Sequence, residues 1–508
     1  MLKSQKLIHF YLFCFISFFW LIIHYDLIFL DPILGRDDLS ILKNIMNTKD
    51  PSDYFQKMIR GDYWDLQPVR DLTLFMNKFL KIHLGFGALH LFNFILALMV
   101  LIKLKTFLLL KKIDSRLVLV IILLIAFHPL YQVIFAWITN RKHLLSFFFI
   151  LCYLIEWERE RKLNYKTTLY MTLSLLSQPI TLFIPLLTMG YEVVDKKKLN
   201  LHTFIDLLLI LIIMVSNYFF YKHMDLFQAR NLMAGGFRDL GWVNNVARAF
   251  SQIFIPISFA TEYDVGHPLA LVGVILGVMT FAFIYKYLLR NPKPYLLLLM
   301  AFSTMYPIPV YNLRDAYVLG TLFLLITLGV ILAGRFLKEQ KIFYLILLLP
   351  ILGFQSYKFV DMWESDEKLT VQSYLIEGGA FNQTNLGFLY RKLNPNFAYQ
   401  LSLDLRENYP GGASYNLFLL VAESYYYTTL KTTEEKLNTY LQSEGKGIFH
   451  LFFKYKFLKD HERLLDAKQT LLHLRQELTL NKEEIPVLKT MVCVHYKEDC
   501  DEIFNHQN

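Results

Sequence analysis

Long apolar stretches recur along most of this 508-residue chain and constrain its fold more than any other feature. A bilayer core about 30 Å thick requires roughly 20 apolar residues in each crossing helix, and the longer stretches meet that length. Because the hydrocarbon core satisfies no backbone hydrogen bonds, we expect each crossing to be helical. The stretches lie at 7–30, 89–110, 117–137, 143–155, 167–177, 179–193, 201–221, 269–289, 295–311, 316–334 and 342–359.

Composition supports a membrane domain followed by a soluble one. Hydrophobic residues make up 55% of the chain, above the roughly 45–50% that is typical of soluble domains. The last part of the chain is ordinary in composition, so we expect a transmembrane domain at 1–359 and a helical domain at 360–508. The net charge of +9 falls in short loops and not on one basic face, which argues against nucleic acid as a partner.

The positions of lysine and arginine predict how the chain threads the membrane, because these residues favour the cytoplasmic side. The groups assigned to that side are Lys3 and Lys6, 103–116, 159–166, 195–198, 286–293 and 335–341. Placing both 166 and 195 inside requires an even number of crossings between them. We therefore expect two short helices that meet at Gln178-Pro179, where proline breaks the helix.

This threading predicts eleven crossings, with the N-terminus in the cytoplasm and the C-terminal domain on the extracytoplasmic side. The first segment is interpreted as a retained anchor. Loops 31–86 and 222–268 then face the extracytoplasmic side, and the amphipathic segment 246–260 is expected to lie flat on the membrane. Short or broken helices are tolerated where they line a cavity, so a cavity open to that side is expected.

Two adjacent carboxylates, Asp37 and Asp38, follow the first apolar stretch directly, with Arg36 beside them. Several further polar residues are predicted at the same ends of other crossings: Arg70, Asp71, His90, His128, Arg141, Lys142, His143, Gln178, Arg314 and Asp315. Arginine binds phosphate through paired hydrogen bonds, and a carboxylate can deprotonate a hydroxyl. Structural roles remain as alternatives, namely helix capping by Asp37, backbone-bonded histidines and side chains that extend to the headgroups.

The order of the motifs resembles the GT-C glycosyltransferases, specifically the transmembrane and tetratricopeptide-containing O-mannosyltransferases and their bacterial relatives. The run QPVRDLT is similar to the family's RPxRxLT, ALHLFN to FHLxN, and SQP to SKP. The segment FHPLYQVIFAWITNRKHLL is similar to HPxxxExVxWxxxRKDLL, and YNLRDAYVL is a weaker counterpart of ERYLYL. With the paired aspartates, these motifs lie at 37–38, 67–73, 88–93, 127–145, 177–179 and 311–319.

The resemblance implies a GT-C fold of about eleven transmembrane helices in a multi-pass protein of the bacterial inner membrane. It also implies inverting transfer of a mannose-like hexose from a polyprenyl-phosphate donor to a protein or glycolipid hydroxyl. Asp37 or Asp38 would be the general base, and a divalent metal at this pair is left open. The implied donor-phosphate and substrate residues are Arg36, Arg70, His90, His128, Arg141, Gln178 and Arg314.

Four positions depart from the family pattern: Gln67 for arginine, Val133 for glutamate, His143 for aspartate and Gln178 for lysine. These departures keep open a substrate of different charge and a non-catalytic scaffold derived from the family. A flippase or transporter for lipid-linked sugars is a further alternative. Transporters place their sites near the bilayer midplane, whereas the candidate residues here lie near one face, which favours the enzyme.

The C-terminal domain is expected to be a small helical domain, with tetratricopeptide-like pairs as one alternative. Helices are expected at 413–427, 431–442 and 447–458, separated by glycine-containing turns. Cys493 and Cys500 could pair in a disulfide on the extracytoplasmic side or remain free thiols.

Overall fold

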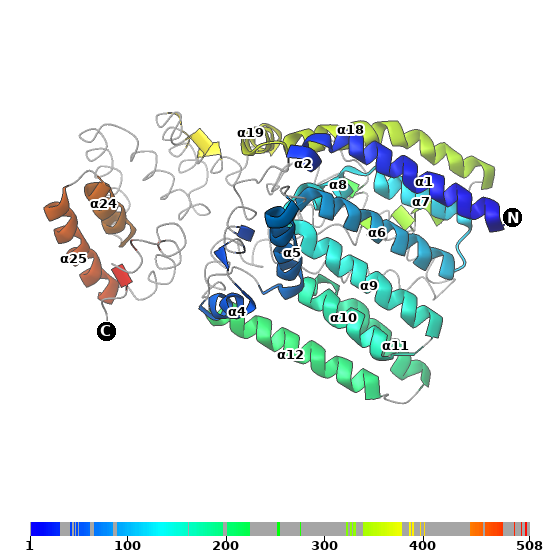
Figure 1. Ribbon diagram of the computed structural model, residues 1–508, viewed down its shortest axis with the longest axis horizontal. Helices are drawn as coiled ribbons and strands as arrows, with labels where there is room; N and C mark the ends of the chain where they lie inside the picture. The colour runs from blue at the N-terminus through cyan, green and yellow to red at the C-terminus, as the bar shows by residue number, and fades with distance from the viewer. Residues whose placement is uncertain are drawn as a thin grey trace. The chain divides into compact units, whose positions relative to one another are not determined.

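The computed structural model describes residues 2–30, 41–42, 45, 47–48, 50–60, 66–84, 89–160, 162–196, 201–223, 251–253, 275, 322–323, 326–327, 329–331, 339–377, 386–387, 389–390, 397, 401, 448–460, 463–480, 492, 499 and 503–504. Across these residues the regular structure is helical and contains no strand (Figure 1). The chain divides into one unit of residues 1–220 and 236–377 and a second of residues 221–235 and 378–508.

Four helices in the described part of the chain are long and apolar enough to cross a membrane. They lie at Leu89–Leu110, Ile138–Glu160, Leu201–Phe219 and Tyr344–Met362. Each coincides with a stretch that the sequence predicted as a crossing. The all-helical character is therefore confirmed for the described residues, and these four helices support membrane association. The count of eleven crossings stays a prediction, because 295–311 and most of 269–289 lie outside the described residues.

Helices α6 (Leu89–Leu110) and α9 (Arg141–Glu160) lie side by side and run in the same direction. At their first residues, the Arg141 guanidinium donates a hydrogen bond to the carbonyl of Leu89 at 2.9 Å. At their opposite ends, Lys111 just beyond α6 forms an ion pair with Glu158 of α9. Because contacts hold both ends, the two helices keep one register along their full length.

Helix α10 (Tyr165–Ser177) returns antiparallel to α9. Near its start, Lys166 pairs with Glu156 at 3.2 Å, and further along Ser174 contacts Ser146 with 3.1 Å between the hydroxyl oxygens. The helix begins where the Asn164 side chain accepts hydrogen bonds from the first free backbone N–H groups, as is typical of an N-cap.

The chain reverses at Gln178-Pro179, as the charge pattern required. A short 3-10 turn, η2 (Pro179–Thr181), leads into α11 (Phe183–Lys196). The Thr181 hydroxyl lies 2.7 Å from that of Ser174, and further along α11 the Thr188 hydroxyl contacts Tyr153 of α9. Helix α11 therefore runs parallel to α9 and antiparallel to α10, so residues 165–196 form two helices instead of one long span.

Helices α7 (Ser115–Ala126) and α8 (Pro129–Ala136) pack beside α6. Helix α1 (Leu2–Ile23) contacts α6 through Trp20 and Phe94, and α18 (Leu349–Met362) packs on α7 and α8. The Trp20 indole of α1 donates a hydrogen bond to the backbone carbonyl of Ala126 at 2.9 Å. The Ser356 hydroxyl of α18 donates to the backbone carbonyl of Phe127 at 2.8 Å. A Cβ added to Gly353 would lie 3.2 Å from the ring of Phe19, so this glycine permits the close approach of α1 and α18.

The stretch predicted as one crossing at 117–137 is two helices, α7 and α8, which are separated at Phe127-His128. Proline lacks an N–H and its ring clashes with the preceding turn, so Pro129 begins a new helix instead of continuing α7. The stretch at 7–30 is nearly continuous, because backbone hydrogen bonds carry α1 through His24 into α2 (Tyr25–Leu30).

The remaining helices of the first unit are α4 (Pro51–Arg60), α5 (Pro68–Leu84), α12 (Leu201–His223, whose last three residues belong to the second unit), the 3-10 segment η4 (Glu339–Leu348) and α19 (Asp366–Glu377). In the second unit, α24 (Ile448–Asp460) packs on α25 (Leu464–Leu480). Helix α24 confirms the helix predicted at 447–458. The helices predicted at 413–427 and 431–442, together with Cys493 and Cys500, lie outside the described residues.

Lys112 adopts a left-handed backbone conformation, with φ of 56°, in the turn between α6 and α7. This conformation is strained for a residue with a Cβ but not for glycine. We expect Lys112→Gly to raise the free energy of unfolding by about 1 kcal/mol relative to Lys112→Ala, which removes the same charge and keeps the Cβ. Denaturant unfolding in detergent checks this, and equal stability of the two variants would contradict it.

Candidate functional site

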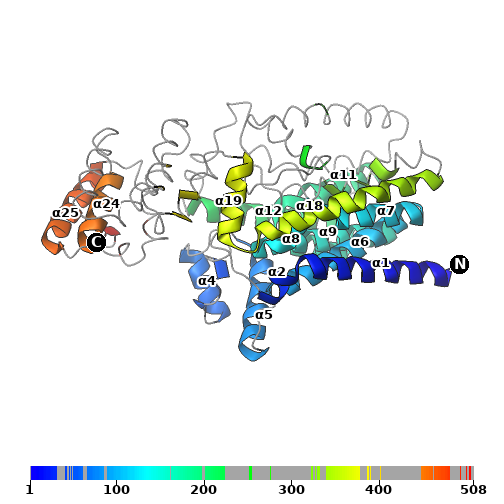
Figure 2. The ribbon, with the colours of Figure 1, turned by 90° about the horizontal axis from the view of Figure 1, so that it is seen from above.

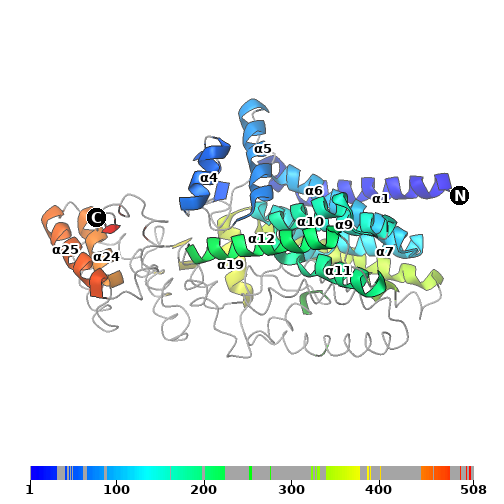
Figure 3. The ribbon, with the colours of Figure 1, turned by 90° about the horizontal axis from the view of Figure 1, so that it is seen from below.

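Polar side chains from four helices meet at one end of the bundle, where α6 and α9 begin and α10 ends. Helix α5 lies across this end, crosswise to the bundle helices in the two views of Figures 2 and 3. Beside it, Ile41 and Leu42 of the first predicted loop pack with Leu74 of α5, Leu89 of α6 and Ile138. This end of the bundle is thus covered by α5 and by residues 41–42, which precede α6 in the chain.

Arg141 connects three of these helices and is completely buried, with 0% of its surface exposed. From the start of α9, its Nε donates to Asn93 Oδ1 of α6 at 2.6 Å. Its Nη1 donates to Asn77 of α5, and its Nη2 to the carbonyl of Leu89. The guanidinium also stacks over the ring of Phe92, 4.5 Å from its centre.

Arg70 and Asp71 form a buried ion pair at the start of α5. The Asp71 Oδ1 lies 2.8 Å from both Nε and Nη2 of Arg70, and its Oδ2 accepts a hydrogen bond from the Tyr54 hydroxyl at 2.7 Å. Tyr54 belongs to α4, so its hydrogen bond to Asp71 joins α4 to α5 within the first predicted loop. Removing one partner of such a pair leaves an uncompensated buried charge, which costs about 3–5 kcal/mol.

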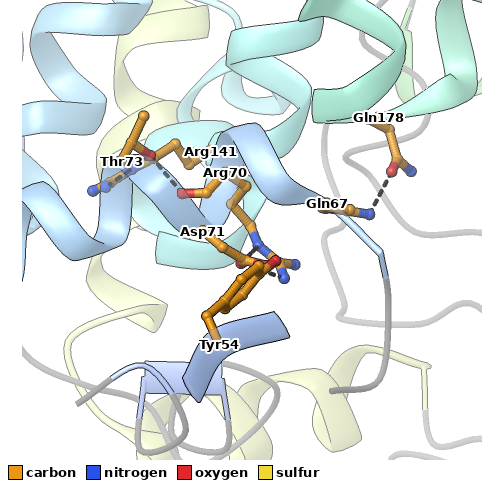
Figure 4. A network of polar contacts seen from close by, with 7 residues as sticks. All are labelled: Tyr54, Gln67, Arg70, Asp71, Thr73, Arg141 and Gln178. Atoms are coloured by element: carbon orange, nitrogen blue, oxygen red, sulfur yellow. Dashed lines mark hydrogen bonds and ion pairs between the residues drawn. The ribbon is translucent and has the colours of Figure 1, made fainter. Parts of the chain in front are cut away.

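Thr73 joins the two arginines, as Figure 4 shows. Its hydroxyl donates to the backbone carbonyl of Arg70 at 2.7 Å and accepts from Arg141 Nη1 at 3.4 Å. Residues 70, 73 and 77 recur at helical spacing, so one face of α5 carries Arg70 and two of the acceptors of Arg141. The two cations belong to one hydrogen-bonded network.

Gln67 and Gln178 contact each other, although they are far apart in the sequence. The Gln67 Nε2 donates to Gln178 Oε1 at 2.6 Å, at the entrance to α5 and the end of α10 (Figure 4). The backbone carbonyl of Gln178 in turn accepts from the Ser146 hydroxyl of α9 at 2.9 Å. Two of the four departures from the family pattern therefore lie together in space.

The two predicted histidines are buried and bonded to backbone groups. His90 Nε2 lies 3.1 Å from the carbonyl of Ala136. His128 Nε2 donates to the carbonyl of Ile253 at 3.0 Å, and its Nδ1 accepts from the backbone N–H of Leu130 at 3.2 Å. This pairing corresponds to a neutral imidazole and gives His128 a structural role at the break between α7 and α8.

The structure thus describes five of the predicted site residues: Arg70, His90, His128, Arg141 and Gln178. It brings Arg70 and Arg141 into one network, with Gln178 attached to α5 through Gln67 and His90 next to the carbonyl that Arg141 binds. The other four predicted site residues lie outside the described residues: Arg36, Asp37, Asp38 and Arg314. Of the remaining departures, His143 is buried in the first turn of α9 and Val133 lies in α8.

Sequence reasoning did not single out Tyr54, Thr73, Asn77 or Asn93, which complete the network. The helical spacing of Arg70, Thr73 and Asn77 could have identified Thr73 and Asn77, because it places them on the same face as Arg70. Asn93 stands at the asparagine of the run ALHLFN, and its side chain also donates to the carbonyl of Ile138 at 3.3 Å. No local pattern marked Tyr54, because its partner Asp71 lies in another helix.

The network holds two guanidinium groups and one carboxylate in a volume from which water is excluded. The donors described above bind oxygens of the protein, so both arginines act here as positioning residues for the helix ends. Within the described part of the chain, no group of three or more His, Cys, Asp and Glu residues could hold a metal ion.

Comparison of the chain with protein-family models, with curated proteins and with solved structures gives no match. The site is therefore defined by its own residues and geometry.

We expect Arg141→Lys to lower the free energy of unfolding by about 2–4 kcal/mol, because an ammonium keeps the charge but cannot reach the acceptors on both α5 and α6. The matched control is Arg116→Lys, the same exchange at an exposed arginine near the start of α7, for which we expect less than about 1 kcal/mol. Denaturant unfolding in detergent measures both variants. Equal effects would contradict the bridging role of Arg141.

Proposed function

We propose that the protein is a GT-C type membrane glycosyltransferase. It transfers a mannose-like hexose from a polyprenyl-phosphate donor to a hydroxyl of a protein or glycolipid. The chain crosses a bacterial inner membrane about eleven times, with a cytoplasmic N-terminus, and the reaction takes place on the extracytoplasmic face. The C-terminal helical domain lies on that same face.

One observation carries this proposal: residues of the motifs that resemble the family contact one another at one end of the bundle. The run QPVRDLT supplies Arg70 and Thr73, ALHLFN supplies Asn93, and the segment NRKHLL supplies Arg141. These motifs are separated by up to 111 residues when the Gln67–Gln178 pair is included. A chance likeness in short motifs gives no reason for them to meet in space.

The position of the paired aspartates in the chain supports a site at this end. Asp38 precedes Ile41 by three residues, and three residues span at most about 11 Å. Ile41 packs with Leu74, Leu89 and Ile138, next to the Arg141 network. Chain length alone therefore keeps a first-loop carboxylate within reach of the end of the bundle.

In the proposed reaction, Asp37 or Asp38 takes the proton of the acceptor hydroxyl as its oxygen attacks the anomeric carbon. The bond between that carbon and the phosphate oxygen breaks, and the polyprenyl phosphate leaves with the electron pair. Attack from the face opposite the leaving group inverts the anomeric centre. Arg36 and Arg314 are the cations proposed to bind the phosphate, because the described donors of Arg70 and Arg141 bind protein oxygens.

The neutral Gln67–Gln178 pair points to hydroxyl recognition at this corner of the site. Gln67 Oε1 is buried and accepts no hydrogen bond from the residues that the structure describes. Buried polar atoms are normally paired, so an open acceptor here suits a hydroxyl of the sugar or of the acceptor. The pair replaces two cations of the family pattern without leaving an unpaired charge.

The test is sugar transfer by the full-length protein in lipid, supplied with polyprenyl-phosphate mannose or glucose and membrane extracts as acceptors. We expect Asp37→Asn or Asp38→Asn to lower the transfer rate about 10²–10⁴-fold, because loss of a general base removes that much. Asp53→Asn is the matched control, since Asp53 lies in the same predicted loop and forms an ion pair with Lys57 at 3.0 Å. It should leave the rate unchanged.

Equal rates in all four proteins would overturn the carboxylate mechanism. Absence of transfer by the wild type, together with sugar-lipid movement across the vesicle membrane, would favour the flippase. Absence of both activities would favour the scaffold.

A further inference from the structure

The outer face of α5 carries an apolar stripe that the described fold leaves uncovered. Leu72, Met76 and Phe79 are 62%, 53% and 61% exposed. Their spacing of four and three residues places them on one side of the helix, opposite the face that holds Arg70, Thr73 and Asn77. This helix is thus polar and hydrogen-bonded on its inner side, and apolar and largely exposed on its outer side.

The connection to α6 fixes where this stripe lies relative to the membrane. Helix α5 ends at Leu84 and α6, a candidate membrane span, begins at Leu89. The intervening chain reaches at most about 18 Å. Arg141 also binds Asn77 of α5 and the carbonyl of Leu89 together. Helix α5 is therefore held at the level where a crossing helix leaves the hydrocarbon core.

The orientation of α5 is the one expected of a helix that lies flat at the membrane surface. It lies crosswise to α6, α9 and α10 (Figures 2 and 3), so it runs along the membrane plane if those helices cross the bilayer. Helix α6 has an exposed apolar row of its own, Ile95, Met99 and Ile102, at the same four- and three-residue spacing. Lipid tails cover such a row on a membrane span, and the apolar stripe of a helix held at the end of that span is suited to the same surroundings.

We propose that α5 is an in-plane membrane anchor whose Leu72, Met76 and Phe79 insert into the leaflet at which α6 begins. The partner is the lipid surface, at the boundary between headgroups and acyl chains, where amphipathic helices bury an apolar face. Insertion holds the helix from outside while Arg141 holds it from inside. The depth of α5 in the leaflet then sets where Asn77 and Thr73 present their oxygens to Arg141.

The test places a nitroxide spin label at Leu72→Cys, Met76→Cys or Phe79→Cys, in full-length protein whose four native cysteines are replaced by alanine. The protein is reconstituted in vesicles of phosphatidylcholine and phosphatidylglycerol. Power-saturation spectroscopy then measures collisions with oxygen, which concentrates in lipid, and with a water-soluble nickel chelate. Ile95→Cys of α6 is the lipid-facing control, and Ser52→Cys, exposed on α4, is the water-facing control.

We expect the three α5 labels to show an oxygen-to-nickel collision ratio several-fold above that of Ser52→Cys and nearer to that of Ile95→Cys. Ratios equal to that of Ser52→Cys would overturn the proposal, because the stripe would face water. Low collision rates with both reagents would also overturn it, because protein would then cover the stripe. The measurement involves no sugar transfer, so it stands apart from the test of the enzyme.

Discussion

A buried guanidinium has no water to bind, so it must take its hydrogen bonds from the protein, and Arg141 of α9 takes them from α5 and α6. That requirement fixes the relative positions of α5, α6 and the start of α9. The contacts of Lys111 with Glu158 and of Lys166 with Glu156 hold the opposite ends. The described bundle is thus secured by polar contacts at its two ends, with apolar packing between them.

The chain reversal at Gln178 depends on the same arrangement. The hydroxyls of Ser146, Ser174 and Thr181 lie within 3.2 Å of one another, and they join α9, α10 and the turn that leads into α11. Small side chains let these helices approach closely, which is how helices associate in lipid. The turn then places Gln178 beside Gln67 and attaches α5 to the bundle at a second point.

Local patterns predicted much of the helical structure. The apolar stretch at 89–110 has the bounds of α6, and charge placement predicted the reversal at Gln178-Pro179. Hydropathy alone predicted one crossing at 117–137, whereas Pro129 begins a separate helix there. Sequence patterns could not reveal that Arg141 would bind Asn77 and Asn93, since pairings between distant residues depend on how helices pack. The phosphate role that the resemblance implied for Arg141 stays a prediction, and its described donors bind oxygens of α5 and α6.

We propose that a lipid-phosphate sugar donor binds at the end of the bundle where α6 and α9 begin. A photoreactive polyprenyl-phosphate hexose can be crosslinked to the protein in vesicles, and the labelled residues mapped by mass spectrometry. We expect crosslinks within 31–42 and 66–77 that an excess of unlabelled donor suppresses. Crosslinks at the opposite end, within 111–116 or 156–166, or labelling that unlabelled donor does not reduce, would contradict it.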